Sequence, residues 1–199
     1  SKALEVIESY FWQFCDDYIE LVKNRAYGTP DEQGHVPSEK AVKSARTALG
    51  LGLDAFARLL APYLPYATEE VWSWMHAGSG SVHRAAWPVV DPYVEAATGA
   101  SPELLTWAGK AVEQLRKIKS EAKVSMKTPI LSVALSAASE GVDAIHAALG
   151  DIAQAGRVVG KFDLVAKHAE ESAAEDAPET EVAVEASELG EPPAKKPKH

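Results

Sequence analysis

Apolar residues recur at intervals of three and four over most of the first 120 positions, and this spacing constrains the fold more than any other feature of the chain. One stripe runs through Leu4, Ile7, Phe11, Phe14, Tyr18 and Leu21. A second stripe lies beside it, through Trp12, Cys15, Ile19 and Val22. An apolar face this wide is typical of a helix that packs against two neighbours. The pattern therefore predicts a bundle of helices.

Capping residues divide this region into further helices. Ser38 and Ser101 are favourable N-cap residues for two predicted helices, and Thr68 is predicted to cap a short helix between them. Gly50 and Gly52 fall inside the helix that follows Ser38, where each costs about 1 kcal/mol relative to alanine. Glycines in a helix usually permit a close approach between helices, so we expect these two at a helix contact.

The periodicity changes in the last third of the chain. Leu131, Val133 and Leu135 alternate with smaller or polar residues, which is the pattern of a strand. Helical spacing returns over residues 142–152, and a second strand is predicted over residues 158–165. This order predicts a small unit of strand, helix and strand.

Charge separates the end of the chain from the rest. The 199 residues carry a formal net charge of −9. Nine acidic residues and three lysines give residues 169–199 a net charge of −6, which leaves −3 for residues 1–168. The end segment has no aromatic residue and is rich in Ala, Glu and Pro, so it cannot bury enough apolar surface to offset the entropy of ordering it. We expect a disordered acidic tail.

These patterns predict a mainly α fold in three parts. The first part is an antiparallel helical bundle, and the second is a small α/β subdomain of strand, helix and strand. The third part is the acidic tail. The predicted domains cover residues 1–128, 129–168 and 169–199.

Motifs for catalysis and metal binding are missing from the sequence. It has no glycine-rich phosphate loop, no His-Glu-x-x-His pair and no Gly-x-Ser-x-Gly elbow, so we expect no catalytic residue. The six histidines never lie three or four residues apart, so we expect no metal site. Cys15 is the single cysteine and cannot form an internal disulfide, which fits a reducing compartment such as the cytosol. We expect it to be a buried small hydrophobe. No apolar run approaches the roughly 20 residues that span a bilayer.

One segment is basic although the chain as a whole is acidic. Residues 110–127 carry a net charge of +4. On helical spacing Arg116, Lys119 and Lys123 share a face, so several cations can meet consecutive phosphates of a nucleic acid. A shorter basic run lies early in the helix that follows Ser38, and the alternative for both runs is an ordinary solvated helix face. The candidate phosphate-binding residues are Lys43, Arg46, Arg116, Lys119, Lys123 and Lys127.

Two aromatic residues fall in predicted loops, where a ring can stack on an unpaired base. Tyr27 lies in a predicted loop over residues 26–37, and Trp87 lies in a predicted irregular segment over residues 77–100. The alternative for each ring is packing in the core.

Three segments of the chain resemble those of a known family. Residues 11–21 read Phe-Trp-Gln-Phe-Cys-Asp-Asp-Tyr-Ile-Glu-Leu and resemble the Phe-Cys-Asp-x-Tyr-x-Glu-Leu helix of valyl-tRNA synthetases. Residues 60–72, which end in Thr-Glu-Glu-Val-Trp, and residues 81–88, which end in Trp-Pro, are similar to segments of the class I synthetases for branched aliphatic amino acids. The three segments follow the family's order and roughly its spacing, and the resemblance extends from residue 1 to about residue 168.

The resemblance implies that the chain is the C-terminal, anticodon-binding region of a class I valyl-tRNA synthetase, with tRNA(Val) as its partner. It implies a cytoplasmic, monomeric enzyme that ligates valine to tRNA(Val), with ATP and Mg²⁺ in a catalytic domain. The catalytic His-x-Gly-His and Lys-Met-Ser-Lys-Ser motifs are absent from these residues, as is the editing domain. We therefore expect this chain alone to hold no cofactor and to be inactive.

The resemblance also leaves departures and alternatives. The family's bundle begins one helix earlier than Ser1, which implies that a face of the leading helix lacks its partner here. An acidic tail stands where many bacterial valyl enzymes have a basic coiled coil. The alternatives are an isoleucyl-type anticodon-binding domain, which the Phe-Cys-Asp segment disfavours, and a non-enzymatic helical module that binds proteins.

Overall fold

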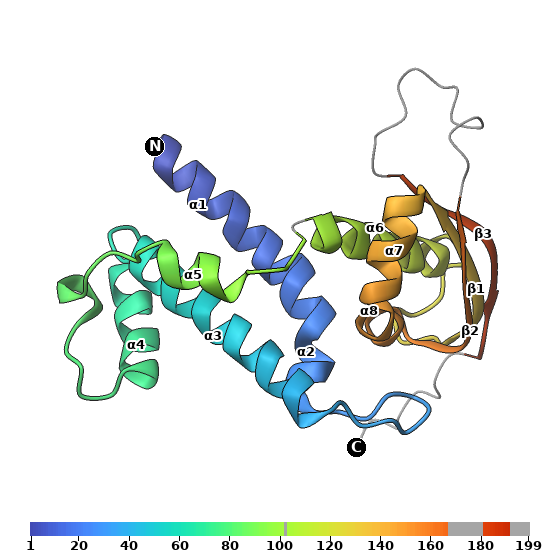
Figure 1. Ribbon diagram of the computed structural model, residues 1–199, viewed down its shortest axis with the longest axis horizontal. Coiled ribbons are helices and arrows are strands. Elements are labelled where there is room, and N and C mark those ends of the chain that lie inside the picture. The colour runs from blue at the N-terminus through green and yellow to red at the C-terminus, as the bar shows by residue number, and fades with distance from the viewer. Residues whose placement is uncertain (102, 167–180, 192–199) are drawn as a thin grey trace. The chain divides into compact units, whose positions relative to one another are not determined.

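Helices make up most of the first hundred residues of the computed structural model, and a three-stranded sheet lies in the remainder (Figure 1). The predicted mainly α fold with a small α/β part is confirmed. The structure describes residues 1–101, 103–166 and 181–191. It divides into unit 1, which comprises Ser1–Ala26 and Ser38–Ala100, and unit 2, which comprises Tyr27–Pro37 and the chain from Ser101 onward.

Unit 1 is built from helices and helical turns. Its long central helix begins where the sequence predicts, because the Ser38 hydroxyl accepts a hydrogen bond from the Ala41 amide. The elements are α1 (Lys2–Gln13), the π-helical turn η1 (Phe14–Ile19), α2 (Glu20–Tyr27), α3 (Glu39–Leu60), α4 (Pro65–Met75), the 3₁₀ turn η2 (Val82–Arg84) and α5 (Asp91–Ala96).

Two local predictions in unit 1 are wrong. Helix α4 begins at Pro65, so Thr68 lies inside it, where its hydroxyl donates to the Leu64 carbonyl instead of capping the first turn. The segment over residues 77–100 is not irregular throughout, because it contains η2 and α5. Proline is well suited to the first position of a helix, where no amide hydrogen is needed.

Aromatic rings join the first helical stretch to α3. The rings of Phe11 and Phe14 each lie 5.4 Å from the ring of Phe56, measured between centroids. A Cβ at Gly52 would lie 2.6 Å from the Phe14 ring, whereas a Cβ at Gly50 would meet nothing within 4 Å. The predicted close approach is therefore confirmed at Gly52 and wrong at Gly50.

The wide apolar face of the leading helix is buried only towards its end. Leu21 and Val22 are buried, whereas α1 has no buried residue. Val6, Tyr10 and Trp12 are at least half exposed. Among the described residues, the prediction that this face packs against two neighbours is therefore wrong for α1.

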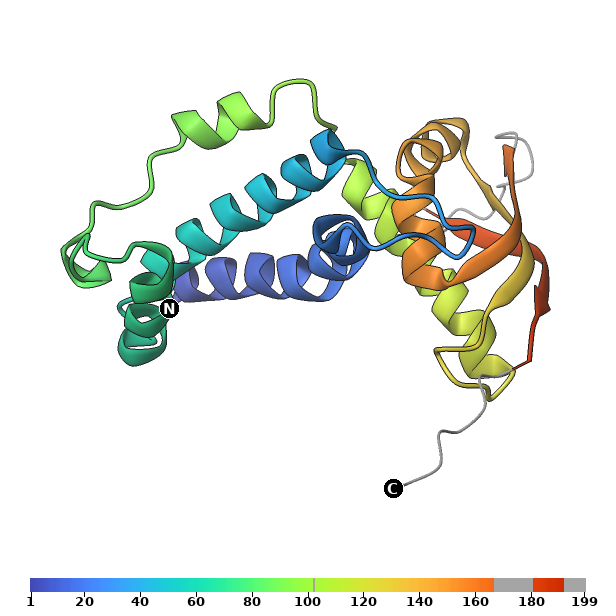
Figure 2. The same cartoon turned by 90° about the horizontal axis from the view of Figure 1, so that it is seen from below.

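The sheet of unit 2 has the strand order β2-β1-β3. Strand β1 (Ile130–Ala137) pairs in parallel with β2 (Val158–Ala166), and the crossover between them contains α7 (Ser139–Ala147) and α8 (Leu149–Gly156). The predicted strand, helix and strand are thus confirmed, with the helix broken at Ala148. The helices of unit 2 lie on one face of the sheet (Figures 1 and 2).

Helix α6 (Glu103–Glu121) belongs to unit 2. Trp107 and Leu115 on α6 are buried, and each fills the space that a side chain would need at a glycine of the facing helices, Gly141 and Gly156 respectively. The structural division of the chain therefore differs from the predicted boundary at residue 128. The predicted apolar stripe of α6 faces inward, and it packs against α7, α8 and β3.

The predicted disordered tail contains a strand. Strand β3 (Val182–Leu189) pairs antiparallel with β1, and Val182 is 3% exposed. The Glu185 carboxylate accepts a hydrogen bond from the buried Ser136 hydroxyl of β1. The prediction is wrong for this stretch, while the rest of the predicted tail, residues 169–180 and 192–199, lies outside the described residues.

Candidate nucleic-acid interface

Two predicted phosphate-binding residues of unit 1, Lys43 and Arg46, are both exposed on α3. Together with Glu39, Val42 and Thr47 they line a shallow surface hollow of about 410 Å³. We call Lys43 and Arg46 the α3 patch. A basic hollow open to solvent can accept a phosphate group.

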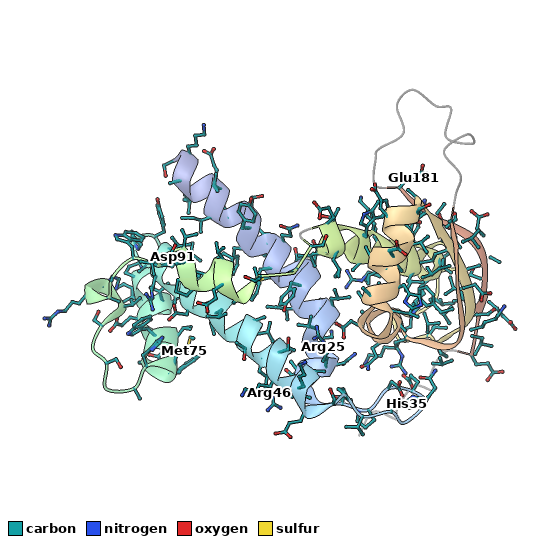
Figure 3. All side chains as sticks on the ribbon, viewed as in Figure 1. Arg25, His35, Arg46, Met75, Asp91 and Glu181 are labelled. Carbon is teal, nitrogen blue, oxygen red and sulfur yellow. The ribbon has the colours of Figure 1, made fainter. Side chains whose placement is uncertain are left out.

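Arg46 also stabilises the end of the neighbouring helix. Its Nε donates to the Ala26 carbonyl in the last turn of α2, at 2.8 Å. This bond fixes the direction of the guanidinium group, and it satisfies a carbonyl that has no partner within the helix. Figure 3 shows Arg25 of α2 at the same end of the α2–α3 pair as Arg46. Arg25 is not among the predicted phosphate-binding residues, because its proximity to Arg46 depends on the pairing of α2 with α3.

Tyr27 is the last residue of α2 and is 78% exposed, so the alternative of core packing is wrong for this ring. The loop that follows is held to residues 157–159 by two side-chain contacts. Arg157 forms a 2.7 Å ion pair with Glu32, and the Gln33 side chain donates to the Val159 carbonyl at 2.9 Å. The ring therefore stands at the beginning of a loop whose middle is anchored.

Trp87 is 62% exposed, so core packing is wrong for this ring too. The segment around it is tied to α3 on both sides. Arg58 donates to the Ala86 carbonyl at 3.3 Å, and the Tyr93 hydroxyl donates to Asp54 at 3.5 Å. Arg58 and Asp54 in turn form a 2.9 Å ion pair. An exposed indole between two anchors is suited to stack on an unpaired base.

The Asp54 carboxylate connects further groups in this part of unit 1. It forms a second close pair with His76, at 2.9 Å. Burial, followed by the charge of Asp54, raises the pKa of Tyr93, so its phenol keeps the proton that it donates. Side chains of α3 therefore hold the segment that carries Trp87, and His76, which follows α4, pairs with one of them.

Unit 2 presents exposed cations along the end of α6 and the turn that follows it. Arg116 and Lys117 are exposed on the helix, and Lys117 lies 4.0 Å from Glu121. Lys123 and Lys127 are exposed in the turn. Lys123 has a φ of 54°, in the left-handed region, where the chain leaves the helix. We call residues 122–129 the basic turn.

Lys119 is not part of this exposed surface. It is 2% exposed, and its Nζ donates to the carbonyls of Met126 at 3.0 Å and of Gly156 at 2.8 Å. Burial, followed by the charge of Arg157, lowers the pKa of Lys119 to about 8. The prediction that Lys119 contacts phosphate directly is therefore wrong, because the side chain points into the core of unit 2.

A metal site and a reactive thiol would each need particular groups among the described residues. Its His, Cys, Asp and Glu residues form no group of three or more that could hold a metal ion. Cys15 is partly buried, and burial, followed by the charge of Asp16, raises the pKa of its thiol, which disfavours the reactive thiolate. None of the described helices is long and apolar enough to cross a membrane.

A protein-family model described as the anticodon-binding domain of tRNA ligase matches residues 1–135, about two thirds of the chain. The chain therefore belongs to this family of anticodon-binding domains. The match ends near the predicted boundary at residue 128 and includes α6, which the structure packs with unit 2.

Two relatives of the chain are valine–tRNA ligases. The chain is 98% identical over 199 residues to valine–tRNA ligase of Bifidobacterium longum subsp. infantis, with all of the chain and 22% of that protein covered. It is 41% identical over 198 residues to valine–tRNA ligase of Cutibacterium acnes, with all of the chain and 20% of that protein covered. The chain thus spans about a fifth of the length of these relatives, and the predicted resemblance to valyl-tRNA synthetases is confirmed.

Proposed function

We propose that the chain recognises the anticodon stem and loop of tRNA(Val) as the C-terminal part of a valyl-tRNA synthetase. The observation that carries this proposal is the family match over residues 1–135, together with near identity to a valine–tRNA ligase over the whole chain. The complete enzyme would ligate valine to tRNA(Val) in the cytoplasm, as a monomer. ATP and Mg²⁺ would be held by a catalytic domain outside these 199 residues.

Recognition in this proposal needs contacts rather than chemistry. Exposed cations of the α3 patch and of the basic turn bind phosphates and set the position of the RNA. Exposed rings such as Trp87 stack on bases that are unpaired in the anticodon loop. In the complete enzyme this binding energy helps to place the distant 3′ end of the tRNA for aminoacylation.

Salt dependence separates phosphate contacts from stacking. Each neutralised phosphate adds roughly 0.7 to 0.9 to the slope of log affinity against log salt concentration. We expect Lys43→Glu/Arg46→Glu and Lys123→Glu/Lys127→Glu each to weaken the affinity for a tRNA(Val) transcript and to lower this slope. The control is Lys2→Glu/Lys161→Glu, which makes the same charge change at other exposed positions. If all three variants lose the same affinity, the α3 patch and the basic turn make no specific phosphate contact, and nonspecific electrostatic attraction explains the binding.

Stacking is tested with a matched pair of tryptophans. Loss of a stacked ring costs about 1–3 kcal/mol per base. Trp87→Ala should weaken binding by about that amount and leave the salt slope unchanged, whereas Trp74→Ala should have little effect although Trp74 is 72% exposed. Unchanged affinity in Trp87→Ala would remove this ring from the site.

Competition with purified tRNAs tests the identity of the partner. The valyl assignment predicts that tRNA(Val) competes better than tRNA(Ile). The isoleucyl-type alternative predicts the reverse order, and a module that binds proteins predicts no preference. The valine–tRNA ligase relatives support the first outcome.

A further inference from the structure

Lys119 is a buried cation whose hydrogen bonds go to main-chain carbonyls. Its Nζ bridges the Met126 carbonyl in the basic turn and the Gly156 carbonyl at the end of α8. A positive charge at the C-terminal end of a helix is favourable, because carbonyls there have no partner within the helix. The side chain thus joins three segments of unit 2: α6, the basic turn and α8.

The basic turn is folded back onto the residue that holds it. The Val124 amide donates to the Lys119 carbonyl at 3.0 Å, so Lys119 fixes the turn through both its main chain and its side chain. The Thr128 amide donates to the Ser125 carbonyl at 2.9 Å, which closes the turn at its far end. The backbone between Val124 and Thr128 is therefore held at several points.

The carbonyl that Lys119 holds lies between two exposed cations in the sequence. Lys123 precedes Met126 by three residues and Lys127 follows it directly, and both side chains are exposed. The direction in which they leave the backbone depends on the conformation of the turn. A fixed turn lowers the entropy cost of bringing both ammonium groups to neighbouring phosphates.

We propose that Lys119 is a positioning residue for tRNA binding, which holds the basic turn in the conformation that presents Lys123 and Lys127 to phosphates. This proposal rests on the proposed function. No carboxylate among the described residues pairs with this ammonium group, whose hydrogen bonds go to the Met126 and Gly156 carbonyls. Burying such a charge costs free energy, and an apolar side chain of similar length would fill the same space. The charge at residue 119 therefore serves the turn that it holds rather than the packing of the core.

A double-mutant cycle on the 199-residue chain tests the proposal. The variants are Lys119→Met, Lys123→Ala/Lys127→Ala and their combination, and the readout is affinity for a tRNA(Val) transcript at two salt concentrations. We expect Lys119→Met to weaken binding roughly three- to tenfold and to lower the salt slope. In the background that lacks Lys123 and Lys127, the same change should have no effect. Lys119→Arg, which keeps the charge and the donors, should restore most of the affinity.

The outcomes distinguish this inference from the proposed function. If Lys123→Ala/Lys127→Ala weakens binding but Lys119→Met does not, or if the losses simply add, the positioning role is overturned and the proposed function stands. If Lys123→Ala/Lys127→Ala leaves the affinity unchanged, the phosphate contact and the positioning role both fail.

A measurement on the unmodified chain covers the case in which Lys119→Met does not fold. Amide hydrogen exchange at Val124 and Thr128 should be protected to the same degree as exchange in the last turns of α6. Exchange at the rate of an open loop would show that the turn is not held, and this result would overturn the proposal.

Discussion

The buried ammonium of Lys119 gives the chain a stability that depends on pH in an unusual direction. Its pKa is about 8 in the folded chain, below the ordinary value of 10.5. Between these two values the unfolded chain binds one more proton than the folded chain, so stability increases with pH. Below pH 8 both states are protonated, and the folded state carries the full cost of the buried charge. The neutral amine above this pH keeps two hydrogens for its two carbonyl partners.

The size of the effect follows from the shift. One pKa unit corresponds to 1.36 kcal/mol, so a single group moved from 10.5 to about 8 changes the free energy of unfolding by about 3 kcal/mol over the whole range. We expect the stability of the chain relative to Lys119→Met to rise by about 2–3 kcal/mol between about pH 7 and pH 10. Comparison with the variant cancels the titration of groups that both chains share.

Urea unfolding followed by far-ultraviolet circular dichroism at several pH values measures this difference. Lys117→Met is the control, because Lys117 lies two residues away on the same helix and its side chain is 61% exposed. Its unfolding free energy should run parallel to that of the parent chain across the pH range. Parallel curves for Lys119→Met as well would refute the reasoning, since they would mean that folding does not change the pKa of Lys119.

Further predictions concern packing. Gly52→Ala should destabilise unit 1, because a Cβ there would lie 2.6 Å from the Phe14 ring. Gly50→Ala should instead stabilise α3 by up to about 1 kcal/mol. Thermal unfolding of the two variants should show midpoint shifts of opposite sign. Val182→Asp should destabilise unit 2 by about 3 kcal/mol or more, because it buries a charge beside β1. Ala186→Asp places the same charge at an exposed position of β3 and should change the unfolding free energy by less than about 1 kcal/mol. Equal urea midpoints for the Val182 and Ala186 variants would mean that β3 does not pack as described.

Local patterns predicted most of the secondary structure, because the spacing of apolar residues depends only on the geometry of a helix or a strand. The N-cap at Ser38, the alternation that became β1 and the helical stripe of α6 are examples. The sequence also predicted the family through three short segments. In the candidate site it selected Lys43, Arg46, Arg116, Lys123 and Lys127, which the structure leaves exposed, and Tyr27 and Trp87, which are mostly exposed.

Features that depend on distant segments could not be read in this way. Strand β3 lies in an acidic, alanine- and glutamate-rich stretch, and it is ordered by contacts with distant segments, namely pairing with β1 and packing against α6. Arg25 lies near Arg46 only because α2 and α3 meet at that end.

The cations of α6 and of the basic turn illustrate the difference between what the sequence determines and what the tertiary structure determines. By itself the sequence determined that Arg116, Lys119 and Lys123 are cations near one another along one segment, because charge and chain spacing are local properties. Only the tertiary structure decided that Lys119 faces the core, because the carbonyls that receive its hydrogen bonds come from the basic turn and from the end of α8. A buried charge needs partners to offset its lost hydration, and those partners are placed by the fold.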